Sequence, residues 1–350
     1  MQGHAVLRSV VGISAAMVLS AGCSGLGNSV DPISSKPADP GPQSIVLRRV
    51  PTVVAGSLLG AMPPVVATTG KSWASPNTTG PLLYACSYYT SDCVWYHVGH
   101  DVLAGMITGL NHPEGVAVDE AGYVYVANTG ASNILVYAKG STTILRTLDD
   151  SGWYPADIAI DSNGTVYVAN IVDTDFDHGS VTVFRAGATT ATRIIRDTNF
   201  YEVHSLALDE KHNLVVCYRS KAGIGSCDQF VNAYAPGVTR VTGLGLVNGA
   251  KFDAAGNFLV NDGSAAATQE FTSAFASCAT LPQTGFPNFL ALNQNSSDLF
   301  VGNEGNGGGA DITESTYSGC STTATIEFTY NTHWGTNSPW GIAIDPRAIP

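Results

Sequence analysis

Charged side chains are scarce in this sequence, and basic ones are the scarcest. Only 13% of the 350 residues are charged, which argues against a coiled coil or a disordered chain, because both need more charge. The 16 Lys and Arg residues against 28 Asp and Glu leave a formal net charge of −12. An acidic surface repels phosphate backbones, so we do not expect nucleic acid as a partner.

Several signatures of catalytic and metal sites are also missing. No C-x-x-C pair or Cys/His spacing indicates zinc, and no G-x-S-x-G elbow or catalytic Cys/His signature indicates a nucleophile. Beyond the N-terminal region, no stretch approaches the roughly 20 apolar residues of a transmembrane helix. By contrast, 38 Gly and 17 Pro suit many short strands joined by tight turns.

The first residues predict export. Arg8 precedes an apolar run too short to span a bilayer, and the small residues 20–22 follow it. The segment ahead of Cys23 resembles a bacterial lipoprotein signal, although Ser20 stands where Leu is usual. The resemblance implies that residues 1–22 are removed and that Cys23 is lipidated. The protein would then be membrane-anchored through this lipid on the extracytoplasmic side of the bacterial cell envelope. An ordinary cleaved signal peptide is the alternative.

The cysteine count fits an exported chain. Of seven Cys residues, six remain when Cys23 is set aside, and an even set in an exported protein indicates disulfides. Two pairs are close in sequence and flank expected hairpins, and the third pair is distant. We therefore predict, as a hypothesis, the disulfides Cys86–Cys93, Cys217–Cys227 and Cys278–Cys320.

Residues 23–80 carry many Pro, Ser, Gly and Thr residues, which are typical of turns and extended linkers. We predict that this segment is a tether that lifts a folded domain off the membrane. Residues 45–54 are more apolar and are expected to form a strand or a docking segment.

A strand-turn-strand unit repeats along the rest of the chain. In its clearest copy, an apolar strand ends at Asp119, which is followed by Gly122 and a Val- and Tyr-rich strand. The side chain of Asp119 is expected to accept bonds from turn N–H groups, and Gly122 to supply the positive φ. The other copies have their anchors at Asp161, Asp209, Asp253, Asn293 and Asp345. The intervals of 42, 48, 44, 40 and 52 residues match one propeller blade each.

Six copies predict an all-β fold, a six-bladed β-propeller over residues 81–350. The last copy lies almost at the C-terminus, so its outer strands must come from elsewhere. Residues 82–86 resemble the second strand of the unit, and 94–97 and 102–107 would follow as the third and fourth. We predict a composite last blade, with a C-terminal inner strand near Ile344 and N-terminal outer strands, which closes the ring without exposed sheet edges.

The Pro-x-Gly-Val-Ala-Val-Asp…Gly-x-Val-Tyr-Val-Ala-Asn pattern resembles the NHL-repeat propellers. It is also similar to the wider group that contains the senescence-marker-protein-30/gluconolactonase and streptogramin-lyase families. The resemblance covers about residues 81–350 and implies the fold. It does not imply one activity, because this scaffold hosts scaffolding proteins, ligand binders, lactonases and lyases.

The residue five places before each anchor should ring one mouth of the central channel. The six are Glu114, Ala156, His204, Asn248, Asn288 and Trp340. The gluconolactonase-like family holds a divalent cation with a Glu and, after a skipped blade, with Asn, Asn and Asp. The resemblance therefore implies a Ca²⁺, Zn²⁺ or Mn²⁺ site made by Glu114, His204, Asn248 and Asn288. In that family the Asp also acts as the catalytic base. Asn288 stands in its place here, which leaves His204 as the candidate catalytic base.

Three interpretations of this ring stay open. Its polar residues could simply line a water-filled mouth, Trp340 could stack on a small ligand, or the metal set could serve a lactonase-type hydrolase. Our leading hypothesis is a lipid-anchored propeller that binds an unknown small ligand or protein without catalysis. The metal-dependent hydrolase is the alternative.

Overall fold

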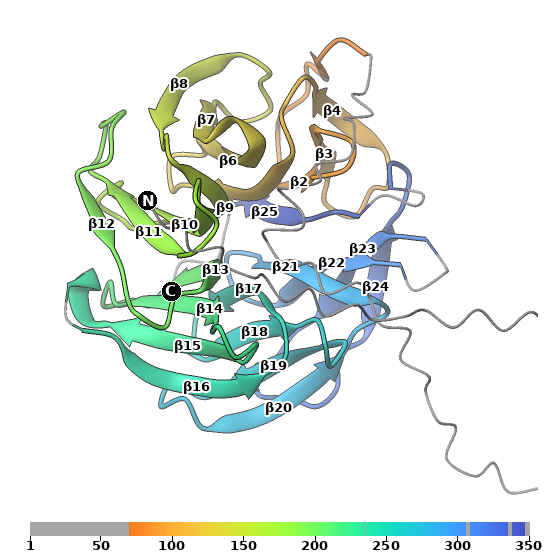
Figure 1. Ribbon diagram of the computed structural model, residues 1–350. Coiled ribbons are helices and arrows are strands. Elements are labelled where there is room, and N and C mark those ends of the chain that lie inside the picture. The colour runs from red at the N-terminus through yellow and green to blue at the C-terminus, as the bar shows by residue number, and fades with distance from the viewer. Residues whose placement is uncertain (1–69, 235, 306–308, 335–337, 347–350) are drawn as a thin grey trace, which may run out of the picture. The chain divides into compact units, whose positions relative to one another are not determined.

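The computed structural model describes residues 70–234, 236–305, 309–334 and 338–346. The predicted signal peptide, Cys23 and most of the predicted tether lie outside these residues. The described chain consists of β-strands and two single-turn 3-10 helices, Thr129–Ala131 and Val231–Ala233. Six sheets surround a central axis, which confirms the predicted six-bladed β-propeller (Figure 1). Among the described residues, no helix is long and apolar enough to cross a membrane.

Blades one to five follow one another along the chain, and each is an antiparallel sheet of four strands in chain order. Blade one contains β5 (Pro113–Val118), β6 (Val124–Asn128), β7 (Asn133–Tyr137) and β8 (Ile144–Asp149). Blade two contains β9 (Trp153–Ile160), β10 (Val166–Asp173), β11 (Ser180–Phe184) and β12 (Arg193–Ile195). Blade three contains β13 (Glu202–Leu208), β14 (Leu214–Arg219), β15 (Gly225–Phe230) and β16 (Val238–Leu244). Blade four contains β17 (Val247–Phe252), β18 (Phe258–Asp262), β19 (Ala267–Phe271) and β20 (Ser277–Pro282). Blade five contains β21 (Phe286–Leu292), β22 (Asp298–Glu304), β23 (Asp311–Thr316) and β24 (Ile326–Tyr330).

Blade six joins the two ends of the folded chain, as predicted. Its strands, from the axis outward, are β25 (Gly341–Asp345), β2 (Leu82–Ser87), β3 (Asp92–His97), β4 (Leu103–Ile107) and β1 (Trp73–Ala74). Leu83 lies opposite Ile344, which confirms the expected pairing. The fifth strand, β1, belongs to the segment that the sequence analysis assigned to the tether. It pairs with β4, and the Thr108 hydroxyl donates to the Gly70 carbonyl at 2.8 Å.

The repeated Asp builds the inner turn of its blade as predicted. Asp119 Oδ1 accepts the N–H groups of Ala121 at 3.0 Å and Tyr123 at 2.9 Å, and Gly122 has a φ of 83°. Blades two to four repeat both bonds with Asp161, Asp209 and Asp253. Local turn chemistry therefore recurs with the blade period.

The last Asp has a different partner. Asp345 forms an ion pair with Lys139 Nζ at 2.6 Å, and the same amine donates to the Gly80 carbonyl at 2.9 Å. Lys139 belongs to the turn between β7 and β8 of blade one. It therefore fastens both chain ends of blade six to the neighbouring blade.

Apolar side chains pack between neighbouring blades. Between blades one and two, for example, Tyr125 and Val136 pack with Val168 and Phe184 in one buried cluster. All three predicted disulfides are present, as Cys86–Cys93, Cys217–Cys227 and Cys278–Cys320. The first two join directly opposite residues of a hairpin, and the third links β20 of blade four to the segment after β23 of blade five. Such bonds fit a protein that folds in an oxidising compartment.

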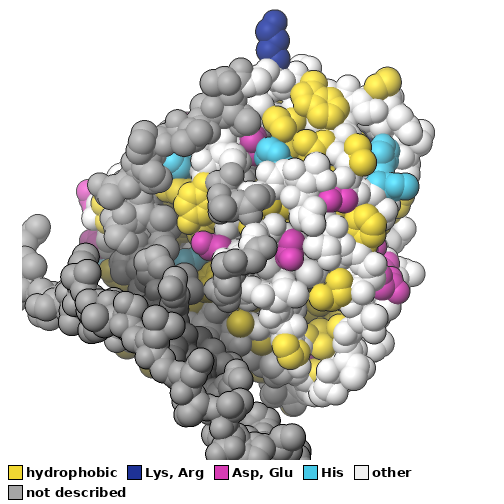
Figure 2. Space-filling view, turned by 90° about the vertical axis from the view of Figure 1, so that its right-hand side faces the viewer, with side chains coloured by type: hydrophobic (Ala, Val, Ile, Leu, Met, Phe, Trp, Pro, Cys, Tyr) yellow, Lys and Arg dark blue, Asp and Glu magenta, His cyan; other side chains and the backbone are white. Residues whose placement is uncertain are grey.

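The visible surface reflects the acidic composition. On the face shown in Figure 2, Asp, Glu and His side chains are scattered among uncharged atoms, and Lys or Arg stands only at the upper edge.

Candidate functional site

The predicted mouth residues begin the inner strands of their blades. In blades one to five, the register between the first and second strands shifts at this point. In blade one, Pro113 lies opposite Asn128 and Val116 opposite Val126, so Glu114 and Gly115 share one partner position. Each of these mouth residues therefore lies in a β-bulge, which re-aims a side chain out of the regular alternation.

The two mouth asparagines connect neighbouring blades. Asn248 Nδ2 donates to the Pro287 carbonyl of the next blade at 2.8 Å, and Asn288 Nδ2 donates to the Pro339 carbonyl at 3.1 Å. These amides satisfy backbone carbonyls near the start of the next blade's inner strand. Both asparagines therefore have a structural role whatever else they bind.

The glycine of the Pro-x-Gly motif allows the inner strands to touch. A Cβ on Gly115 would lie 2.3 Å from the Ala156 carbonyl oxygen, and one on Gly341 would lie 2.1 Å from the Glu114 carbonyl oxygen. Real Cβ atoms do not approach backbone so closely. At these two positions the ring is closed by backbone contact between adjacent blades.

Glu114 is the most perturbed group of the ring. Its side chain is 2% exposed, and Oε1 has no hydrogen-bond partner among the described residues. Burial raises the pKa of this carboxyl to about 8, so much of it is protonated at neutral pH unless a cation joins it. Burial also raises the pKa of Tyr89 to about 12, with smaller effects from the charges of Glu304 and Glu114.

Trp340 belongs to an aromatic cluster beside Glu114. Its ring centroid lies 5.8 Å from that of Tyr88 and 6.3 Å from that of Tyr89, and Tyr88 lies 4.5 Å from His112. The Trp340 Nε1 and Tyr88 Oη atoms are buried without a hydrogen-bond partner among the described residues. The predicted stacking platform is thus already packed against two tyrosines.

Sequence reasoning missed both tyrosines. Tyr88 and Tyr89 lie in the turn between β2 and β3, inside the loop closed by the Cys86–Cys93 disulfide. That turn belongs to the composite blade, and no repeat anchor precedes it in the sequence. The repeat pattern therefore did not single out these residues. The adjacent Tyr-Tyr pair within a short disulfide loop was the available signal.

His204 lies in a small ionic cluster. Its Nε2 is 3.4 Å from Glu202 Oε2, and Arg219 Nη1 is 3.6 Å from the same oxygen. Glu202 is buried, so this arrangement compensates a carboxylate in the protein interior. The contact directs one ring nitrogen of the candidate base toward a carboxylate.

The predicted metal site stays a prediction. Among the described residues, no hydrogen bond joins the side chains of Glu114, His204, Asn248 and Asn288. The Oδ1 atom of Asn288 is buried without a partner, as is Oε1 of Glu114, and oxygens of this kind suit a hard cation. The choice among Ca²⁺, Zn²⁺ and Mn²⁺, and the role of His204 as a base, rest on the resemblance.

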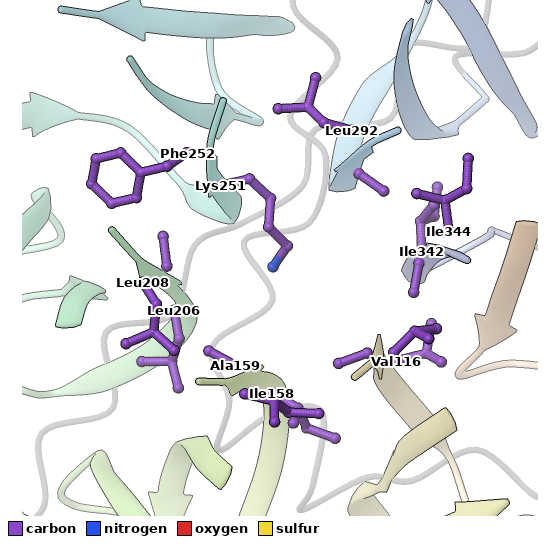
Figure 3. A pocket seen from close by; sticks show the side chains of 16 residues that line it. Val116, Ile158, Ala159, Leu206, Leu208, Lys251, Phe252, Leu292, Ile342 and Ile344 are labelled. Carbon is purple, nitrogen blue, oxygen red and sulfur yellow. The ribbon is translucent and has the colours of Figure 1, made fainter. Parts of the chain in front are cut away.

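Beyond the mouth, the inner strands of all six blades line a cavity (Figure 3). Its lining is formed by residues 116–118, 158–160, 206–208, 251–252, 291–292 and 342–344. These residues are Ala, Val, Ile, Leu and Phe with one exception. In Figure 3 the Lys251 side chain extends from its strand into the cavity with its amine toward the centre.

Comparisons with solved structures show the fold. A crystal structure of a nidogen/laminin complex contains a chain that is 16% identical, with a TM-score of 0.60 over 76% of this chain and 98% of that one. A protein of unknown function from Bacteroides caccae is 12% identical, with a TM-score of 0.57 over 76% and 99%. The hydrazine synthase of Kuenenia stuttgartiensis is 15% identical, with a TM-score of 0.54 over 71% and 76%.

Comparisons of sequence add no family. No protein-family model matches the chain, and no curated protein does. At the identities above, the structural likenesses carry the propeller architecture and no activity. The six-bladed propeller is therefore the level at which this chain is classified.

Proposed function

We propose that this protein is an exported binding module that holds a small ligand in its central channel. The observation that carries the proposal is the cavity itself, which is lined by the inner strands of all six blades. Ligand sites in proteins are mostly apolar concavities with few polar groups, and this cavity has that character. The alanines on the inner strands leave the axis open where larger side chains would fill it.

The polar groups near the mouth support binding without catalysis. The two asparagines fasten blades together, and His204 faces a buried carboxylate. The raised pKa of Glu114 makes this carboxyl a poor ligand at neutral pH unless a cation displaces its proton. These features give the mouth residues structural roles that do not depend on catalysis.

The hydrolase alternative makes a distinct prediction. Wild-type protein would retain one equivalent of a divalent cation after dialysis, and Glu114→Gln would lose it. Metal analysis of both proteins decides the matter, because a wild type without stoichiometric metal removes the basis for a metal-dependent lactonase.

The cell-envelope location is part of the same proposal. Three disulfides fit an exported protein, and we propose that lipidation of Cys23 anchors it to the membrane. Wild-type protein should then sediment with the membrane fraction, and Cys23→Ser should not. Membrane recovery of the Cys23→Ser variant would contradict the lipid anchor.

The channel itself is tested with a neutral apolar dye, N-phenyl-1-naphthylamine, whose fluorescence rises in apolar surroundings. We expect saturable binding to wild type and at least about tenfold weaker binding to Ala117→Leu, which fills the cavity. Ala255→Leu, on an exposed turn, is the matched control and should bind like wild type. Equal binding by Ala117→Leu, or no saturable binding by wild type, would refute the channel site.

A further inference from the structure

One position on the inner strands breaks the repeat. The residue two places before each anchor is alanine in five blades, at 117, 159, 207, 291 and 343, and lysine in blade four, at Lys251. All six line the cavity. Five blades form with alanine here, so the fold does not require a long cationic side chain at the sixth. A departure from the local rule at a position that lines the cavity points to function.

The Lys251 ammonium group has no hydrogen-bond partner among the described residues. It forms an ion pair with Asp157 Oδ2 at 3.8 Å, which is longer than a hydrogen bond. Asp157 is already satisfied, because its carboxylate accepts the N–H groups of Ile158 at 2.8 Å and Leu206 at 2.9 Å. It also accepts the Ser205 hydroxyl at 2.7 Å. The N–H donors of Lys251 therefore remain available to a ligand.

The surroundings of Lys251 define the charge and shape of that ligand. Apart from Lys251, the cavity lining contains no ionisable side chain. In Figure 3 the amine stands among apolar walls that include Ile158, Leu292 and Ile342. Apolar surroundings strengthen the attraction between the Lys251 ammonium group and an anion. They equally strengthen its repulsion of a second cation. Lys251 is the one cationic group of this lining, so a ligand with one negative group leaves no second anion without a partner in the apolar cavity.

We infer that the channel binds a monovalent organic anion with an apolar body, of which a medium-chain carboxylate is the simplest example. The carboxylate accepts hydrogen bonds from Lys251 Nζ, and the hydrocarbon lies along the alanine and branched apolar side chains. This inference rests on the proposed channel site and names the chemical class of its ligand.

The test compares octanoate with 1-octanol, which share a hydrocarbon chain and differ in charge. Isothermal titration of the full chain should show octanoate binding at least tenfold more weakly to Lys251→Met than to wild type. Binding of 1-octanol should change less than about twofold, because methionine preserves the apolar wall. Lys221→Met, on an exposed turn, is the matched control and should bind both compounds like wild type.

Other outcomes separate this inference from the proposed function. If wild type binds 1-octanol or the neutral dye but not octanoate, the anion is wrong and the channel site stands. If nothing binds, both fail. Equal octanoate binding by Lys251→Met also overturns the inference, because Lys251 would then serve only Asp157. Should Lys251→Met fail to fold, the Asp157→Asn/Lys251→Met double variant removes both charges, and it too must lose octanoate binding while retaining 1-octanol.

Discussion

Replacing Glu114 with glutamine should make the stability of this propeller less sensitive to rising pH. Burial raises the pKa of the Glu114 carboxyl from 4.5 to about 8, with no basic side chain opposing the effect. Between these values, the folded protein holds a proton that the unfolded chain releases. The stabilisation is therefore fully present below pH 4.5 and is lost as the pH rises through 8.

The size of the effect follows from the same two values. Each pH unit in this window costs about 1.4 kcal/mol, so the whole window is worth about 5 kcal/mol. Between pH 5.5 and 7.5, wild type should lose about 3 kcal/mol through Glu114 alone. Glutamine has no proton to release, so Glu114→Gln escapes this loss. The difference in unfolding free energy between variant and wild type should shift by that amount in favour of the variant.

Urea unfolding followed by tryptophan fluorescence, with EDTA present at pH 5.5 and 7.5, measures this shift. Other buried carboxyls, such as Asp150 with its pKa raised to about 7 by burial, affect both proteins alike and cancel in the comparison. Glu210→Gln, on an exposed turn, is the control and should follow wild type. If Glu114→Gln loses as much stability as wild type, the buried carboxyl is already ionised and compensated, and the reasoning from burial is refuted.

Two further predictions concern closure and crosslinking. Gly341→Ala places a Cβ about 2.1 Å from the Glu114 carbonyl oxygen and should destabilise the fold by about 3 kcal/mol in urea unfolding; Gly70→Ala, which meets no atom within 4 Å, should be neutral. A neutral Gly341→Ala would show that blades one and six do not touch at the mouth. Loop-closure entropy predicts that removing Cys278–Cys320, with a separation of 42 residues, costs about 4 kcal/mol, and removing Cys86–Cys93, with a separation of 7, about 2.4 kcal/mol. A lower urea-unfolding midpoint for the variant without Cys86–Cys93 than for the variant without Cys278–Cys320 would contradict this account.

The blade architecture was readable from local patterns. The anchor at Asp119 and its copies in blades two to four combine a turn-capping carboxylate, a positive-φ position and an apolar strand, and these features recur at the blade period. The incomplete last copy also predicted that residues near Leu82 pair with the strand near Ile344, and the structure pairs them. Both inferences depend on neighbours in sequence or on the need to close a ring, so one chain was enough to make them.

The environment of each mouth residue was not readable in the same way. Glu114 has the sequence appearance of a metal ligand, yet its burial and the raised pKa that burial causes arise from packing in the folded ring. The amide hydrogen bonds of Asn248 join residues that lie 39 positions apart. Spacing along the chain reports which residues share a level of the propeller, and it does not report which atoms they use to hold the blades together.

Lys251 separates what the sequence determined from what depends on the tertiary structure. The sequence alone determined the six-bladed scaffold and the composite blade, because these follow from repeated local chemistry and chain order. Cysteine spacing gave the disulfide pairs as a hypothesis, which the structure confirms. Only the tertiary structure placed Lys251 within an apolar cavity and showed that Asp157 is satisfied by other donors. The physical reason is that a side chain's charge environment is set by every blade that surrounds it, and these blades meet only in the closed ring.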